Sequence, residues 1–103
     1  MGIIRIALES EHGAIESEVN GNTHLIDPLL ESLSDTSSHC LQYIDPYGDT
    51  VFNRGQMEPF IREWDSLHAS AKSSEVRTLF HEVRVLAEKC ASEPHLYLKF
   101  YGD

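Results

Sequence analysis

The spacing of hydrophobic residues alternates between a two-residue repeat and a 3.6-residue repeat along this sequence. In residues 3–9, Ile4, Ile6 and Leu8 fall on one side and Arg5 on the other. This pattern predicts an opening β-strand.

A second strand is expected over residues 14–19, where Ile15 and Val19 share one face. The polar turn at residues 10–13 predicts that this strand runs back antiparallel to the first. The dipeptide Asn20-Gly21 suits a type I′ turn, so we expect a further reversal before the next element.

The strongest local signal is a predicted β-hairpin in the middle of the chain. Asp45 offers a side-chain acceptor at the first turn position, Pro46 presets φ at the second, and Gly48 permits a positive φ at the fourth. The flanking runs Leu41–Ile44 and Thr50–Phe52 favour strands. The turn is expected to be type I, closed by a glycine bulge, with Asp49 directly after it.

Helices are predicted on both sides of this hairpin. Asp27 followed by Pro28 resembles an N-cap and first helical residue, so a short helix is expected through Leu33 and a polar loop over Ser34–Ser38, with the hairpin starting near His39.

Two longer helices follow the hairpin, because apolar residues then recur at helical spacing. Pro59 places the first start near Gln56 or Met57, and Ser73 or Ser74 caps the second beside Glu75. The two apolar stripes are Met57, Phe60, Ile61, Trp64, Leu67, His68 and Ala71, and then Val76, Leu79, Phe80, Val83, Leu86 or Ala87, and Cys90.

Pro94 ends the helical pattern, and residues 95–101 return to a two-residue repeat. Leu96, Leu98 and Phe100 share one side of this last strand. We therefore predict one α+β domain over residues 1–103, with an antiparallel or mixed sheet of four or five strands and an antiparallel pair of amphipathic helices packed on one face.

Composition narrows the classes of partner. The chain has 103 residues, 17 acidic and eight basic, for a formal charge of −9. This balance argues against nucleic acid as a partner. The negative charge either serves solubility alone or attracts a basic protein partner, such as the nucleic-acid-binding face of a nuclease. No run is long and apolar enough for a bilayer span and no signal peptide is evident, so we expect a cytoplasmic protein that does not bind membranes.

Candidate chemistry is sparse, and no cofactor is predicted. Asp45 and Asp49 are four residues apart across a turn, but a role in closing that turn is favoured over cation binding. The cysteines, Cys40 and Cys90, are expected to be buried free thiols.

Three histidines are candidate metal ligands or catalytic residues. His39 and Cys40 are adjacent and would point to opposite faces of a strand, while His68 on the apolar stripe is expected to cap the core edge. A thiolate pair of Cys40 with His39 or His95 lacks any supporting motif, so an enzyme is the least favoured class.

Two motifs resemble those of a group of small uncharacterised bacterial proteins, some associated with mobile gene cassettes. They are Ile44-Asp-Pro-Tyr-Gly-Asp-Thr-Val-Phe-Asn53 and the terminal Pro94-His-Leu-Tyr-Leu-Lys-Phe-Tyr-Gly-Asp103. The resemblance implies an accessory cytoplasmic protein with an immunity-like or antitoxin-like role, by analogy rather than from any site residue.

The more informative pattern is aromatic. If both helices cover one face of the sheet, the other face displays His95, Tyr97 and Tyr101, with Gln42 or with Leu41 and Tyr43 according to the pleat. The N-terminal segment folding across it, a partner or second copy, and a small ligand are the three ways to cover such a face. We therefore expect a non-enzymatic binding protein that forms a homo-oligomer, with a small-molecule protein using a tyrosine-lined cavity at the sheet or subunit interface as the alternative.

Overall fold

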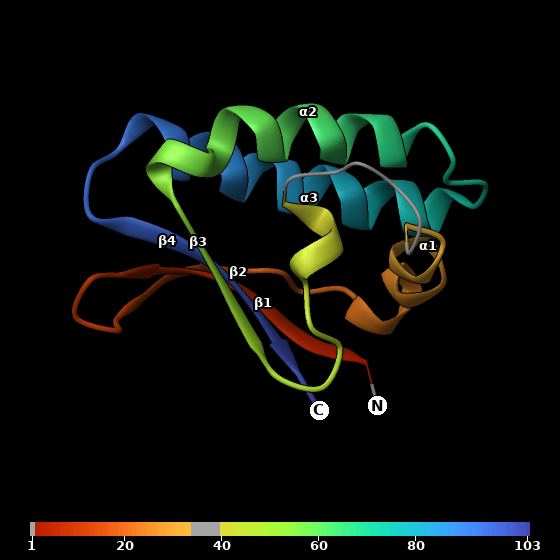
Figure 1. The fold of residues 1–103 in the computed structure, drawn as a ribbon, viewed down its shortest axis with the longest axis horizontal. Helices are drawn as coiled ribbons and strands as arrows, with labels where there is room; N and C mark the ends of the chain where they lie inside the picture. Colours follow the sequence, from red (N-terminus) through yellow and green to blue (C-terminus); the bar gives the residue numbers. More distant parts are fainter. Residues whose placement is uncertain (1, 34–39) are drawn as a thin grey trace.

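The computed structural model describes residues 2–33 and 40–103. Within these residues four strands form one antiparallel sheet in the order β2-β1-β4-β3, and the two long helices lie side by side on one of its faces (Figure 1). The strands are β1 (Ile3–Ser10), β2 (Ile15–Glu18), β3 (Asp49–Asn53) and β4 (Leu96–Gly102); the α-helices are α1 (Asp27–Glu31), α2 (Met57–His68) and α3 (Ser74–Ser92); and the 3₁₀ helices are η1 (Thr23–Ile26), η2 (Leu41–Tyr43) and η3 (Arg54–Gln56). The α+β fold predicted from the sequence is confirmed, and none of the described helices is long and apolar enough to cross a membrane.

Both long helices begin where the sequence predicts. Ser73 accepts a hydrogen bond from the Val76 N–H (3.1 Å) and so caps α3. The entry to α2 is fixed by a capping box that the sequence analysis did not identify, in which the side chains of Asn53 and Gln56 each accept the other's backbone N–H. These caps fix where the chain turns from β3 into α2.

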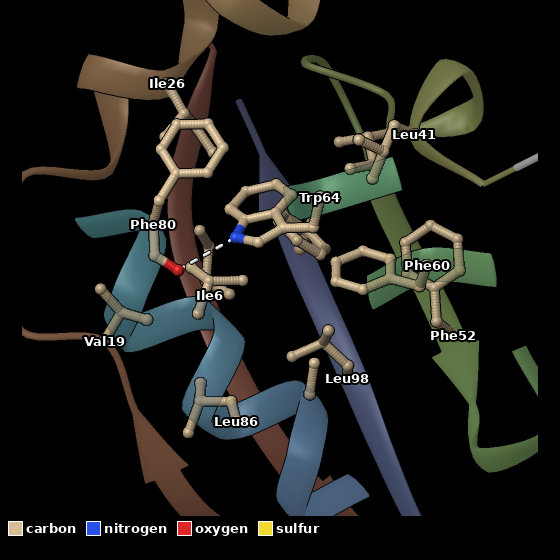
Figure 2. Close-up of a cluster of buried hydrophobic side chains, with 14 of the residues drawn as sticks. Ile6, Val19, Ile26, Leu41, Phe52, Phe60, Trp64, Phe80, Leu86 and Leu98 are labelled. Carbon is tan, nitrogen blue, oxygen red and sulfur yellow. Dashed lines mark hydrogen bonds between the residues drawn. The ribbon is translucent and has the colours of Figure 1, made fainter. Parts of the chain in front are cut away.

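An aromatic cluster holds the helices against the sheet (Figure 2). The Trp64 ring is fully buried, with ring centroids 5.5 Å from Phe60, 4.4 Å from Phe80 and 6.1 Å from Phe100. Its Nε1–H donates to the Phe80 carbonyl at 3.0 Å, which satisfies the one polar atom of the ring. Phe52 extends the cluster to β3 through contacts with Phe60 and Phe100.

A bulge in β1 changes which isoleucine enters the core. Ile3 pairs with Gly102 but Arg5 pairs with Tyr101, so Ile4 is an extra residue in β1. The side chain of Ile3 is therefore buried and that of Ile4 is 52% exposed. The prediction that Ile4 shares a face with the buried Ile6 and Leu8 is wrong for this reason.

A second bulge has the same effect in β2. Leu8 pairs with Ser17 and Glu9 with Ile15, which leaves Glu16 as the extra residue. Ile15 consequently faces away from the helices, whereas Val19 enters the core. The prediction that Ile15 and Val19 share a face is therefore wrong.

The expected type I′ reversal after β2 is also absent. Neither Asn20 nor Gly21 has a positive φ, and the chain continues into η1.

The prediction of a central hairpin is wrong in its first half. Residues 41–43 form η2 rather than a strand, and β3 pairs with β4 instead. Here Glu63 Oε1 on α2 accepts the backbone N–H groups of both Cys40 (3.0 Å) and Leu41 (3.1 Å), so a side chain, and not a neighbouring strand, satisfies these donors.

The turn itself also differs from the predicted glycine bulge. Gly48 does not have a positive φ. Its missing side chain instead leaves room for the Asp45 carboxylate, since a Cβ at Gly48 would lie 2.9 Å from Asp45 Oδ2.

The helix predicted at Asp27-Pro28 is present as α1, but Asp27 is not its N-cap. Its Oδ1 accepts the Ile3 N–H at 3.1 Å and so ties α1 to the first strand. Gly2, at φ 108°, permits this approach, because a Cβ there would lie 1.9 Å from Asp27 Oδ2. The predicted loop at Ser34–Ser38 and the hairpin start near His39 lie outside the described residues.

Gly102 is a site where a single methyl group should be poorly tolerated. A Cβ on Gly102 would lie 2.5 Å from the Pro46 carbonyl carbon and 2.6 Å from the Asp45 carbonyl oxygen, and these backbone atoms cannot rotate away. We expect Gly102→Ala to lower the free energy of unfolding in urea by about 1–3 kcal/mol. Gly21→Ala is the matched control, since its Cβ would meet Glu82 Oε2 at an ordinary 3.4 Å. Equal stability of the two variants would contradict this close packing.

Candidate binding face

The sheet has a second face, and no described helix lies over it (Figure 1). We call this side, away from α2 and α3, the uncovered face. Cross-strand pairing arranges its side chains in three rows. The rows are Arg5, Tyr101 and Asp49; then Glu18, Ala7, Lys99 and Val51; then Ile15, Glu9, Tyr97 and Asn53.

A buried carboxylate lies on β1, one of the two central strands of this face. Glu9 is only 4% exposed, although it stands on the side of the sheet without helices. Its Oε1 is 3.2 Å from Lys99 Nζ, and its Oε2 accepts a hydrogen bond from the Tyr101 hydroxyl. Both oxygens are thus engaged, which meets the requirement that a buried charge be paired.

Tyr101 reaches Glu9 by lying along the surface of β1. It pairs with Arg5 but its hydroxyl bonds to Glu9, so its ring spans the small residue Ala7, which is fully buried. The Arg5 guanidinium lies 5.6 Å from the Tyr101 ring centroid and also pairs with Glu18. We call Arg5, Glu9, Glu18, Lys99 and Tyr101 the Glu9 cluster.

The Glu9 cluster affects the acidity of the tyrosine. The hydrogen bond to the Glu9 carboxylate raises the pKa of Tyr101 to about 12, and burial adds to the effect. Because this pKa lies above the ordinary value of 10, the contribution of Tyr101 to stability is complete below pH 10 and is lost as the pH rises to about 12.

The side chains available to a partner lie around this cluster. Ile15 and Val51 are 46% and 47% exposed, on the strands at the two sides of the sheet. Tyr97 is half-buried, and its hydroxyl makes no hydrogen bond to any described residue. Apolar contact area is therefore on the edge strands of the face, and the Tyr97 ring lies beside Glu9 on the polar central strands.

The structure brings together only some of the predicted interface residues. Tyr97 and Tyr101 are neighbours on β4 and share the uncovered face. His95 stands at its end with φ 67°, and its Nδ1 is 3.1 Å from Glu11 Oε2. Tyr43, in η2, is 68% exposed but belongs to no strand, and Leu41 is buried, so the predicted contribution of residues 41–43 to this face is wrong.

The predicted turn residues lie in and next to the loop between η2 and β3, and Asp45 makes hydrogen bonds within it. Asp45 Oδ1 accepts the Tyr47 N–H at 2.8 Å, and the Asp45 N–H donates to Thr50 Oγ1 at 2.9 Å. Asp49, in β3, lies in the same row as Tyr101. Residues 45–48 curve around the end of β4, where the Gly102 N–H donates to the Gly48 carbonyl at 2.7 Å.

The two thiols are buried and free. Burial raises the pKa of both Cys40 and Cys90, and the nearby Glu63 carboxylate adds to the rise at Cys40. Both are therefore protonated at neutral pH and are weak nucleophiles. Among the described residues Cys40 bonds to Glu63 and Gln56 whereas His95 pairs with Glu11, and His39 lies outside the described residues.

His68 lies at the end of α2, where its ring stacks on Phe80 with centroids 5.3 Å apart. This placement at the rim of the core agrees with the predicted structural role of His68.

A pocket of about 310 Å³ lies at the end of the molecule near α1, apart from the rows of the uncovered face. It is lined by Gly2, Asp27, Leu30, Glu31, Ile44, Pro46 and Tyr47. Apolar side chains form part of the wall and two carboxylates lie at the same site.

Glu9 and Lys99 are not among the site residues predicted from the sequence. Their signal is in the last strand, where a lysine and two tyrosines occupy the alternate positions that face away from the core. These positions lie opposite the first strand, which contains Glu9. Pairing β1 with β4 would have placed all of them in adjacent rows.

Replacing Glu9 tests whether its charge sets the acidity of Tyr101. In Glu9→Gln the neutral amide no longer opposes formation of the tyrosinate, so we expect the Tyr101 pKa to fall from about 12 toward 10. Tyrosinate absorbance during a pH titration measures this change, with Tyr101→Phe to assign the transition. Glu18→Gln removes a carboxylate that contacts Arg5 instead, and should leave the pKa near 12. Identical titrations of Glu9→Gln and the wild type would contradict the assignment.

Comparisons of the chain with protein-family models, with curated proteins and with solved structures find no match. The resemblance to small bacterial proteins of mobile gene cassettes therefore stays a prediction.

Proposed function

We propose that this chain is a binding protein that catalyses no reaction and that associates with further copies of itself through its sheet. The observation that carries the proposal is the one-sided covering of the sheet, because α2 and α3 occupy one face and no described helix occupies the other. A sheet with one bare face and two edge strands in its described part offers both an area and a backbone for contact.

Charge favours the sheet as the place where copies meet. The uncovered face carries two basic and three acidic side chains, a formal charge of −1 out of −9 for the whole chain: Arg5, Lys99, Glu9, Glu18 and Asp49. Two copies that meet at the sheet therefore repel each other less than copies that meet elsewhere.

The chemistry of the uncovered face and of the two buried thiols supports binding over catalysis. The Glu9 carboxylate is occupied by Lys99 and Tyr101, which leaves no free base at the centre of the face. The Cys40 and Cys90 thiols are buried with raised pKa values, so neither supports a nucleophilic mechanism.

The remaining charge supports a basic protein as a further partner. Besides the five charged residues named above for the uncovered face, the sequence has 14 acidic and six basic residues, from totals of 17 and eight. Such an excess attracts a positively charged protein over a distance of about 10 Å at moderate salt. We include in the proposal an immunity-like or antitoxin-like role in the cytoplasm, where free thiols such as Cys40 and Cys90 persist.

Light scattering over a range from low micromolar to millimolar concentration tests self-association. We expect the mass to rise with concentration toward twice the 11.7 kDa of the chain. Added salt should strengthen the association, because it screens the repulsion between two chains of charge −9. A constant mass of one chain at every concentration and salt level would remove self-association from the proposal.

The pocket near α1 favours small-molecule binding as a second candidate function. Its 310 Å³ is at the lower end of the range for ligand sites, and its Asp27 and Glu31 carboxylates suit a cationic group beside apolar side chains. A thermal-shift screen of small amines tests it, since a ligand at ~100 times its Kd stabilises the fold by roughly 2.7 kcal/mol. The shift should disappear in Glu31→Gln, and a shift that persists in this variant would place the ligand elsewhere.

A further inference from the structure

We propose that two copies of the chain join along β3, antiparallel and centred on Val51, so that their two sheets continue as one. This inference rests on the proposed self-association and identifies the contact that produces it.

The direction of the backbone groups of β3 follows from one hydrogen bond. The Gly102 N–H donates to the Gly48 carbonyl at 2.7 Å, and these residues continue the β3–β4 register in which Asp49 pairs with Tyr101. In an antiparallel ladder alternate residues bond to the same neighbour, so Thr50 and Phe52 bond to β4. Val51 must then direct its N–H and carbonyl away from β4.

A side chain confirms this direction at the next outward residue. The Asn53 N–H donates to Gln56 Oε1 at 2.8 Å, outside the ladder with β4. No described residue bonds to the N–H or the carbonyl of Val51. The loop before β3 donates a hydrogen bond to the Thr50 hydroxyl. Thr50 pairs with the buried Phe100, so this contact is on the core side of β3 and not at its free edge. The unpaired backbone of Val51 is therefore at the free edge of the described sheet.

The other edge strand of the described sheet has features that oppose pairing. β2 has four residues, contains the bulge at Glu16, and carries Glu16 and Glu18. Short length, bulges and charges are the usual protection of a sheet edge. β3 pairs with β4 in unbroken register, has neither lysine nor proline, and exposes 47% of Val51. Of the two edges, β3 is the one suited to accept a strand.

The sequence of β3 is compatible with pairing to itself. A twofold axis at Val51 places Asp49 opposite Asn53 of the second copy, so each carboxylate faces an amide and the two carboxylates are far apart. The Val51 residues then form a hydrogen-bonded pair and bury their exposed side chains against each other. A register centred on Asp49 would instead place two carboxylates together.

This arrangement also determines how the copies are oriented. Residues directly opposite in a sheet point to the same face, so both helix layers lie on one side and both uncovered faces on the other. The dimer therefore presents one continuous uncovered face, and the Tyr97 rings remain accessible on it. A contact limited to one short strand per copy is expected to be weak and dependent on concentration.

Disulfide trapping with Val51→Cys tests the register. The Cα atoms of a hydrogen-bonded antiparallel pair are about 5.5 Å apart, within the range that a disulfide bridges. Asp49→Cys is the matched control. In this register each Asp49 lies four residues along the strand from Asp49 of the second copy, a separation of roughly 13 Å. Under mild oxidation at micromolar concentration, we expect covalent dimer from Val51→Cys at least about tenfold faster than from Asp49→Cys. The native thiols are buried and should not compete.

Val51→Pro tests the backbone contact itself. Proline at this position removes an N–H that points away from β4, so the ladder within the chain is kept while the ladder between copies loses its central donors. We expect the dimer dissociation constant to rise at least about tenfold, with an unchanged far-ultraviolet circular dichroism spectrum. Val51→Thr retains the N–H and is the control that should still dimerise.

The outcomes separate this inference from the proposed function. A dimeric wild type in which Val51→Cys crosslinks no faster than Asp49→Cys would overturn the β3 contact and leave self-association standing. A wild type that is monomeric at every concentration would overturn both. If Val51→Pro fails to fold, the crosslinking rates of the two cysteine variants alone decide the result.

Discussion

The burial of Trp64 joins the three parts of this fold. Its ring contacts Phe60 on its own helix, Phe80 on α3 and Phe100 on β4, and its only polar atom donates to the Phe80 carbonyl. Truncating a buried tryptophan usually costs about 3–5 kcal/mol, a large fraction of the stability of a chain of this size. Because one ring contacts both helices and the sheet, the two helices are held on the same side. The one-sided layer arrangement depends on this packing, and the exposed side of the sheet follows from it.

The bare side of the sheet is not simply apolar. Antiparallel sheets commonly have one solvated face, and the paired charges of Glu9 and Lys99 suit such a face. Stacking a second copy on this centre would remove these paired charges from water, which usually offsets most of the electrostatic gain. The strand margins, where Ile15 and Val51 are exposed, carry no such penalty. The polar centre and the apolar margins thus have different roles, one fixing the strands and the other available for contact.

Hydrophobic periodicity was sufficient to predict the helix pair, three of the strands and the α+β class, because each depends on a repeat that continues over several residues. It failed where one residue changes the register, as at Ile4 and Glu16, since a bulge has no clear signal in the pattern of the strand. It failed again at Leu41, where a glutamate 22 residues away on α2 takes the backbone hydrogen bonds of an expected strand. The Glu9 cluster escaped prediction because it requires the knowledge that the first and last strands are neighbours.

The pairing of β1 with β4 affects how the chain folds during its synthesis. Ser10 ends β1 and Leu96 begins β4, so at typical synthesis rates of about 5–20 residues per second β1 leaves the ribosome roughly 4–17 s before β4. Local contacts such as the α2–α3 hairpin form in far less time, whereas closing so long a loop delays the central strand pair. During that interval β1 can pair with β2 alone, and the apolar side chains of Ile3, Ile6 and Leu8 lack their neighbours on β4. A nascent chain with this topology therefore exposes part of its future core until its last residues are made.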